Sequence, residues 1–300
     1  MAHCEPGPDR SQTSGMTKQL PGDGRTVGAA TALASALSNQ LGAASGTLAF
    51  PVLGSVGVVA VRQIVAALIL LPVVRPRIRD LTRAQWWPVL LLAVVFGAMN
   101  LTLYAAIDRI GLGLAVTLEF CGPLAVALLG SRSRTSALCA LVAGAGVVAI
   151  AGPRPSSDQL GIALGLAAAC CWAAYILLNR IIGLRLPGAQ GTATATGVSA
   201  AVFLPVAVWT LATTHPDAGT VLLAVGAGVL ATAVPFVADV IALRRLPTSV
   251  FGMLMSVNPV LAALIGAVVL GQDVGAAGWI GIALIVTANA AVLRRGRRAR

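Results

Sequence analysis

Apolar runs recur along almost the whole 300-residue chain, and they restrict its fold more than any other feature. Each run is about 20 residues long, which is the length that an α-helix needs to cross the hydrocarbon core of a bilayer. The composition agrees, because 57% of the residues are hydrophobic, only 10% are charged and the mean hydropathy is +0.89. In soluble domains, by contrast, about a quarter of the residues are charged. The sequence therefore predicts an all-α integral membrane protein.

Ten transmembrane helices are expected from these runs. Their predicted ranges are 27–49, 54–74, 88–107, 112–130, 135–151, 159–181, 190–212, 219–243, 248–270 and 275–293. The residues before the first run are rich in proline, glycine, serine and charge, a composition that does not fold by itself. We therefore predict a disordered cytoplasmic tail at residues 1–26 and a basic cytoplasmic tail at residues 294–300.

The basic residues give these helices an orientation. With the N-terminus in the cytoplasm, the cytoplasmic segments hold 18 of the 21 Lys and Arg residues, and the outer loops hold only Arg109 and Arg154. Lys and Arg concentrate on the cytoplasmic side of helical membrane proteins. Both termini are therefore predicted to be cytoplasmic. The net charge of +11 comes from arginines in short loops, so it is attributed to membrane topology and to contact with anionic lipid. A nucleic-acid partner is not expected.

An internal repeat divides the ten predicted helices into two halves. A shift of 136 residues superimposes Pro259 on Pro123, together with several flanking residues. The halves are residues 27–151 and 159–293, with five helices each. An odd number of helices reverses the direction in which the second repeat enters the membrane. The halves are therefore predicted to be inverted relative to each other, as in many secondary transporters.

Two charged residues lie within the predicted spans at matching depths. Arg62 lies about eight residues into the second span and Glu119 about seven into the fourth, so both are roughly 10–12 Å below the outer end at 1.5 Å per residue. A charge at that depth persists only where it faces a protein interior or a wet cavity. An Arg62–Glu119 ion pair is therefore expected. It is either a static bridge between two helices or part of a substrate or proton site.

Other polar or helix-breaking residues lie near the middle of the spans. Amides there either bind neighbouring helices or line a cavity, and freed backbone groups next to proline need a partner. The substrate or coupling candidates are Glu119, Arg62, Asn39, Gln40, Asn100, Asn258, Trp172 and Tyr175, and the candidate hinges are Gly122, Pro123 and Pro259.

Asp239 is interpreted differently, because it lies close to the inner end of the eighth span. It is expected to be an interfacial carboxylate that pairs with Arg244 or Arg245, near the opposite side of the bilayer from Glu119. An integral-membrane enzyme would need a dense polar cluster within the bilayer, which this separation does not provide. A channel would need a polar stripe through several helices. A scaffold without flux is a further alternative.

No metal site, cofactor or disulfide is expected. The two histidines, His3 and His215, lie outside the spans, so the usual imidazole ligands are absent from the membrane. Four of the five cysteines lie in apolar segments, where cysteine acts as a small hydrophobic residue. The sequence leaves open whether the chain works alone or as a homodimer.

Three stretches resemble a known family, the EamA type of the drug/metabolite transporter superfamily. Residues 118–128 (LEFCGPLAVAL), 241–248 (IALRRLPT) and 251–256 (FGMLMS) are similar to motifs of its bacterial threonine/homoserine exporters. The resemblance implies two EamA-like repeats and proton-linked export of small neutral amino acids across the bacterial inner membrane. A carrier of a different metabolite or drug is the alternative within the superfamily.

A mechanism follows from the two buried charges. In the empty site Arg62 and Glu119 would neutralise each other. An amino-acid zwitterion would replace that pair, with its carboxylate on Arg62 and its ammonium on Glu119. The breaks at Gly122-Pro123 and at Pro259 would let one repeat rock against the other.

Overall fold

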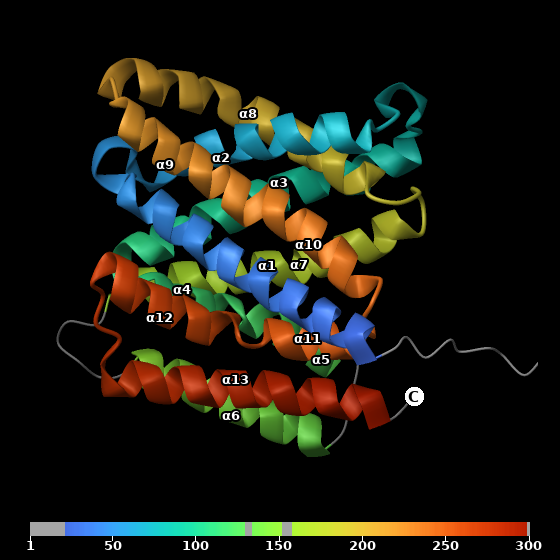
Figure 1. Cartoon of the computed structure of the whole chain (residues 1–300), viewed down its shortest axis with the longest axis vertical. Coiled ribbons are helices and arrows are strands. Elements are labelled where there is room, and N and C mark those ends of the chain that lie inside the picture. Colours follow the sequence, from blue (N-terminus) through green and yellow to red (C-terminus); the bar gives the residue numbers. More distant parts are fainter. Residues whose placement is uncertain (1–21, 130–133, 152–157, 299–300) are drawn as a thin grey trace, which may run out of the picture.

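The computed structural model describes residues 22–129, 134–151 and 158–298, and the regular elements within these ranges are all helical. Figure 1 shows the helices packed side by side in one bundle. They are α1 (Gly22–Leu48), α2 (Phe50–Val74), the short 3₁₀ helix η2 (Ile78–Asp80), α3 (Arg83–Ile110), α4 (Leu112–Glu119), α5 (Cys121–Leu129), α6 (Arg134–Ala151), α7 (Gln159–Gly183), α8 (Gln190–Thr214), α9 (Ala218–Gly228), the π-helical turn η3 (Val229–Ala233), α10 (Val234–Leu243), α11 (Thr248–Met255), α12 (Asn258–Leu270) and α13 (Gly275–Arg298).

Each of the ten predicted ranges falls on one helix or on a run of consecutive helices. Within the described ranges, five helical segments are long and apolar enough to cross a membrane by length and composition: Phe50–Val74, Arg83–Ile110, Gln159–Gly183, Gln190–Thr214 and Ala218–Leu243. Four shorter apolar helices add to these. The terminal helices exceed their predicted ranges, because α1 already begins at Gly22 and α13 continues to Arg298. Residues 1–21 and 299–300 of the predicted tails lie outside the described residues.

Proline interrupts two of the predicted helices. A proline has no N–H to donate to the carbonyl four residues earlier, and its ring crowds that carbonyl. The partner of Pro123 would be Glu119, which is the last residue of α4, and the partner of Pro259 would be Met255, which ends α11. The first break therefore lies at Phe120, slightly before the predicted Gly122-Pro123 position.

A third interruption was not predicted, because residues 219–243 form α9, η3 and α10 and not one regular helix. Pro235 follows η3 and lacks the N–H that would continue the α-helical ladder. Ser38 on α1 donates a 2.8 Å hydrogen bond to the carbonyl of Leu230 in this π-helical turn. Gly42 allows this approach, because a Cβ there would lie only 2.6 Å from the backbone nitrogen of Ala231.

The most extensive helix contacts join the two parts of the chain. They are α3 with α7, α2 with α8, α6 with α13, α1 with α10 and α4 with α12. In each pair one helix precedes residue 152 and the other follows residue 157. The helices of the first part correspond in order to those of the second part. If each helix is replaced by its counterpart in the other part, the same set of pairs results; for example, the pair of α3 with α7 becomes the pair of α10 with α1. Figure 1 shows α6 and α13 along one edge of the bundle and α2 and α8 near the opposite edge.

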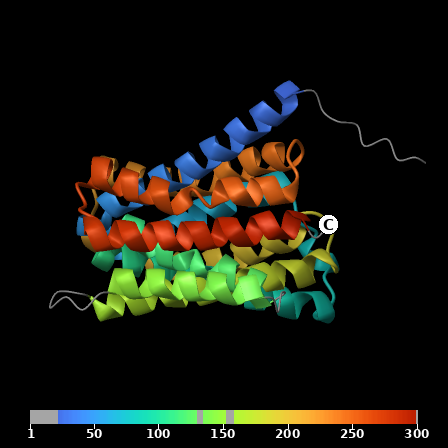
Figure 2. The ribbon, with the colours of Figure 1, turned by 90° about the horizontal axis from the view of Figure 1, so that it is seen from below.

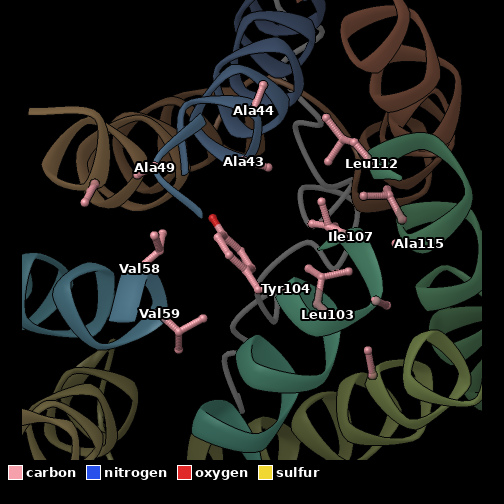
Figure 3. Packing of buried hydrophobic residues seen from close by; sticks show 14 of the residues in the cluster. Ala43, Ala44, Ala49, Val58, Val59, Leu103, Tyr104, Ile107, Leu112 and Ala115 are labelled. Atoms are coloured by element: carbon pink, nitrogen blue, oxygen red, sulfur yellow. The ribbon is translucent and has the colours of Figure 1, made fainter. Parts of the chain in front are cut away.

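A tightly packed core closes one end of the bundle. It lies where α1 and α3 end and where α2 and α4 begin, and Figure 3 shows Tyr104 at its centre. Tyr104 is fully buried, and its hydroxyl has no hydrogen-bond partner among the described residues. Its neighbours in this core include Ala43, Ala44, Ala49, Val58, Val59, Leu103, Ile107, Leu112 and Ala115. The core therefore excludes water from that end.

The opposite end of the bundle holds the start of α1 and the end of α13, as Figures 1 and 2 show. The connections from α2 to α3, from α7 to α8 and from α10 to α11 lie at this end too (Figure 1). Around the bundle, large apolar side chains point outward: Leu68, Val94, Val202, Trp209, Leu222 and Val268 are each at least 68% exposed. Such a surface is stable against lipid chains and unfavourable in water.

One end of α7 is fixed by Asp158. Its carboxylate accepts a 2.9 Å hydrogen bond from the backbone N–H of Gly161 and forms a 2.8 Å ion pair with Arg109 at the end of α3. An aspartate before a helix satisfies backbone donors of the first turn. The hydrogen bond from Gly161, and then the one from Arg109, lower the pKa of Asp158 below its usual value of 3.8.

The lowered pKa predicts how this contact depends on pH. Folding stabilises the ionised form of Asp158. Its contribution to the stability of the folded protein is therefore complete above the pKa that Asp158 has in the unfolded chain, and it is lost as the pH falls through the lower pKa of the folded state. We expect Asp158→Ala to lower the melting temperature in detergent at pH 7. Asp158→Asn should lower it less, because asparagine still accepts at a helix start. Near pH 3 the gap between wild type and Asp158→Asn should shrink, and an equal gap at both pH values would contradict the assignment.

Candidate functional site

A cavity of about 440 Å³ lies in the middle of the bundle. This volume is within the usual range for small-molecule sites. All eight substrate or coupling candidates chosen from the sequence line it: Asn39, Gln40, Arg62, Asn100, Glu119, Trp172, Tyr175 and Asn258. Of the three candidate hinges, Pro123 lines the cavity, whereas Gly122 and Pro259 do not.

Glu119 is the most deeply buried charge in the cavity wall. Its side chain stands at the last residue of α4, directly before the break at Phe120, and only 7% of the residue is exposed. In the described part of the chain no group donates a hydrogen bond to its carboxylate and no cation lies within 4.0 Å of it. An isolated buried carboxylate is costly. The cavity beside it is therefore where a positively charged ligand would be most strongly attracted.

Arg62 is held by an aromatic ring, and the expected Arg62–Glu119 ion pair is not formed. The guanidinium carbon lies 5.2 Å from the ring centroid of Tyr104, in a cation–π contact. Among residues 22–129, 134–151 and 158–298, the only ion pair is the one between Arg109 and Asp158. The prediction was wrong because matching depths give a position along the bundle axis and say nothing of where each side chain points. Both charges face the same cavity separately.

Three amides on different helices form the polar part of the wall. The amide nitrogen of Gln40 donates a 2.8 Å hydrogen bond to the side-chain oxygen of Asn258. The amide nitrogen of Asn258 donates a 2.9 Å hydrogen bond to the carbonyl of Met255, which has no helical donor because Pro259 lacks an N–H. Asn100 donates 2.8 Å to Phe96 within its own helix. Asn258 thus supports the break between α11 and α12. No described group donates to the side-chain oxygens of Gln40 and Asn100, so both can accept a hydrogen bond from a ligand.

Aromatic residues form another part of the wall. Trp172 and Tyr175 are one turn apart on α7, so they share a face. Trp172 meets Phe120 edge to face at a centroid distance of 4.7 Å, and Tyr175 lies 6.1 Å from Phe96. This wall has few hydrogen-bonding groups. It suits a ligand with an apolar or methyl-bearing portion.

Asp239 also lines the cavity, contrary to the sequence-based expectation. It was expected to pair with Arg244 or Arg245 at the membrane surface, on the opposite side from Glu119. Instead it accepts a 2.6 Å hydrogen bond from Ser35 on α1, and it pairs with neither arginine. Pro235, four residues before Asp239, was the sequence signal for this position. The π-helical turn before it rotates the following helix, so Asp239 lies on a different face than a regular helix would give it.

Several other polar residues of the wall were missed. Ser35, Ser256 and Asn289 are buried and line the cavity. Serine and asparagine in apolar helices are common as interhelical hydrogen-bonding groups, so the sequence alone gives them little weight. Taken together, the cavity presents one guanidinium, two carboxylates, amide oxygens and an aromatic wall. These groups suit binding of a small charged molecule.

Comparison with known proteins agrees with this arrangement. The model of the EamA-like transporter family matches residues 159–294. The threonine/homoserine exporter RhtA of Salmonella typhimurium (strain LT2) is 34% identical over 255 residues, which cover 84% of this chain and 86% of the exporter. RhtA of Escherichia coli (strain K12) has the same identity and coverage.

The chain belongs to the EamA-like transporter family. As a member of this family it is a transporter of small metabolites and a multi-pass protein of the bacterial inner membrane, and it is not an enzyme. The fold also matches a solved crystal structure of a protein with 19% identity and a TM-score of 0.55, covering 94% of this chain and all of that one. The cavity of this EamA-like transporter is therefore the place to look for its substrate.

Proposed function

We propose that this transporter exports small neutral amino acids such as threonine or homoserine, in exchange for protons. The observation that carries the proposal is that two oppositely charged residues, Arg62 and Glu119, line one central cavity without forming an ion pair with each other. An amino acid carries the complementary pair, a carboxylate and an ammonium. The likeness to exporters named for threonine and homoserine supports the same class of substrate.

Each part of such a substrate has a partner in the cavity wall. The carboxylate would bind the guanidinium of Arg62, which offers a planar set of donors that fits a carboxylate. The ammonium would bind Glu119. The hydroxyl of threonine or homoserine would donate to an amide oxygen, for which Gln40 and Asn100 are placed. Charge-assisted contacts of this kind are strong in a site from which water is excluded.

The proposed topology is ten transmembrane helices with both termini in the cytoplasm. Supporting it, the loops at the end of the bundle that holds the start of α1 and the end of α13 carry Arg75, Arg77, Arg79, Arg185, Arg244 and Arg245. In the described part of the chain, Arg109 is the one Lys or Arg at the other end. Basic residues favour the cytoplasmic side. The core around Tyr104 would then close the cavity on the outer side.

The two proposed repeats, residues 27–151 and 159–293, have support from the packing. The exchange symmetry of the major helix pairs is what a two-fold axis between inverted repeats would produce. The family model also matches residues 159–294, close to the second proposed repeat. Rocking of one repeat against the other, at the breaks near Phe120 and Asn258, would open the outer side.

Transport into inside-out membrane vesicles tests the proposal. With the vesicle lumen acidified, we expect saturable uptake of labelled threonine and homoserine that requires the protein and stops when a protonophore collapses the pH gradient. Vesicles without the protein are the control. An uptake rate that does not change when the pH gradient is removed would refute proton exchange. Absence of any threonine or homoserine uptake, with uptake of another metabolite, would refute the substrate class.

A further inference from the structure

Among the described residues, the cavity wall holds more carboxyl groups than guanidinium groups. Its wall contains two carboxylates, Glu119 and Asp239, and one guanidinium, Arg62. A neutral amino acid adds one charge of each sign, so it leaves the excess unchanged. Buried charges without a counter-charge are costly. The composition of the wall therefore fits a guest with one extra positive charge better than it fits a neutral one.

The second carboxylate, Asp239, is held in place inside the bundle by a neighbouring helix. Ser35 on α1 donates to Asp239 on α10 over 2.6 Å, which fixes the carboxylate from a neighbouring helix. No described arginine or lysine lies within 4.0 Å of it. The rest of the wall points to a ligand independently, because Glu119 is more than nine-tenths buried, has no described partner and faces the same cavity.

The positions of the two carboxylates allow one extended guest to contact both. Glu119 lies ten residues before the end of α5, and Asp239 lies four residues before the end of α10. Both helices end at the same end of the bundle (Figure 1). At 1.5 Å per residue the two residues are roughly 9 Å apart along the axis. The two nitrogens of an extended lysine are ~7 Å apart by standard bond lengths, and each would need a further ~3 Å to reach a carboxylate.

We propose that Asp239 and Ser35 form a second ammonium-binding position, so that the cavity also accepts amino acids with a long basic side chain. This inference rests on the proposed binding of amino acids at Arg62 and Glu119. The α-carboxylate binds Arg62, the α-ammonium binds Glu119, and the side-chain ammonium binds Asp239. The charges of guest and wall are then equal and opposite.

The test measures lysine and threonine in the same vesicles. We expect wild type to take up lysine, and lysine to inhibit threonine uptake. Asp239→Asn keeps the size of the side chain and an oxygen for Ser35 but removes the charge. It should lower the ratio of lysine to threonine kcat/KM about tenfold, since a lost charge-assisted contact has an effect of that order.

Asp108→Asn is the matched control, because Asp108 is an exposed carboxylate at the end of α3 and does not line the cavity. It should leave the ratio unchanged. An Asp239→Asn ratio equal to that of wild type, or no lysine uptake by wild type that carries threonine, would overturn the inference. If wild type carries lysine and not threonine, the neutral substrate class fails, while the loss of lysine uptake in Asp239→Asn still decides the role of Asp239.

Discussion

Glu119→Gln is expected to reduce threonine export by about two orders of magnitude. The substitution keeps the volume of the side chain, so the packing around α4 is retained. It removes the charge that would bind the ammonium of the substrate, while Arg62 remains. Loss of one partner from a buried charge pair costs roughly 2–5 kcal/mol, and each 1.4 kcal/mol is about a factor of ten in affinity. Vesicle uptake and calorimetric binding in detergent measure the two effects separately.

Substitutions of Arg62 separate its charge from its shape. Arg62→Ala should be as inactive as Glu119→Gln, because it removes the group that binds the carboxylate. Arg62→Lys keeps the charge but lacks the planar guanidinium that lies over Tyr104 and matches a carboxylate, so it should retain only part of the activity. Asp108→Asn again serves as the control for loss of a carboxylate elsewhere. Transport by Glu119→Gln at the wild-type rate would exclude Glu119 as a substrate or coupling group.

The second large effect concerns folding. Gly122 lies near the start of α5, where this helix packs on α7, and a Cβ there would lie 2.3 Å from the backbone oxygen of Ala169. Backbone cannot rotate away as a side chain can. We therefore expect Gly122→Ala to destabilise the protein by about 2 kcal/mol or more, the upper part of the range for an overpacked core. This gives Gly122 a packing role, in addition to the hinge role proposed from the sequence.

Gly144 provides the comparison for this prediction. It lies on α6, where a Cβ would point into space that no other described helix or side chain fills. Gly144→Ala should therefore be neutral, or stabilising by up to about 1 kcal/mol through helix propensity. Thermal unfolding of the purified variants in detergent, with the yield of monodisperse protein, measures both effects. Equal melting temperatures for the two variants would show that α5 can move away from α7 and that the close approach is not required.

The sequence predicted the helices and the cavity residues for one physical reason. Within a bilayer a polar group must face protein or water, so each polar residue in an apolar run was also a candidate for the interior. The eight residues chosen in this way all line the cavity. Their roles in transport remain predictions. Length and hydropathy likewise placed the helical segments, because a membrane-spanning helix needs a nearly constant number of apolar residues.

The contacts of these residues could not be predicted in the same way. Depth along a helix follows from counting residues, but the direction of a side chain depends on the rotation of its helix against its neighbours. Arg62 therefore meets Tyr104 and not Glu119. Counting also fails where the helix is irregular, since the π-helical turn η3 changes the phase of every residue after it. This is why Asp239 faces the cavity and not the membrane surface.

The pairing of helices across the two parts of the chain has a consequence for biosynthesis. The hydrogen bonds from Ser35 to Asp239 and from Gln40 to Asn258 join residues 204 and 218 positions apart. At about 5–20 residues per second, α1 waits roughly 10–40 s in the membrane before its partners emerge from the ribosome. Its serines, Asn39 and Gln40 are without their final neighbours during that time. The nascent protein is then open to capture by insertion factors and to degradation by membrane proteases, so the speed of translation becomes part of how much transporter a cell obtains.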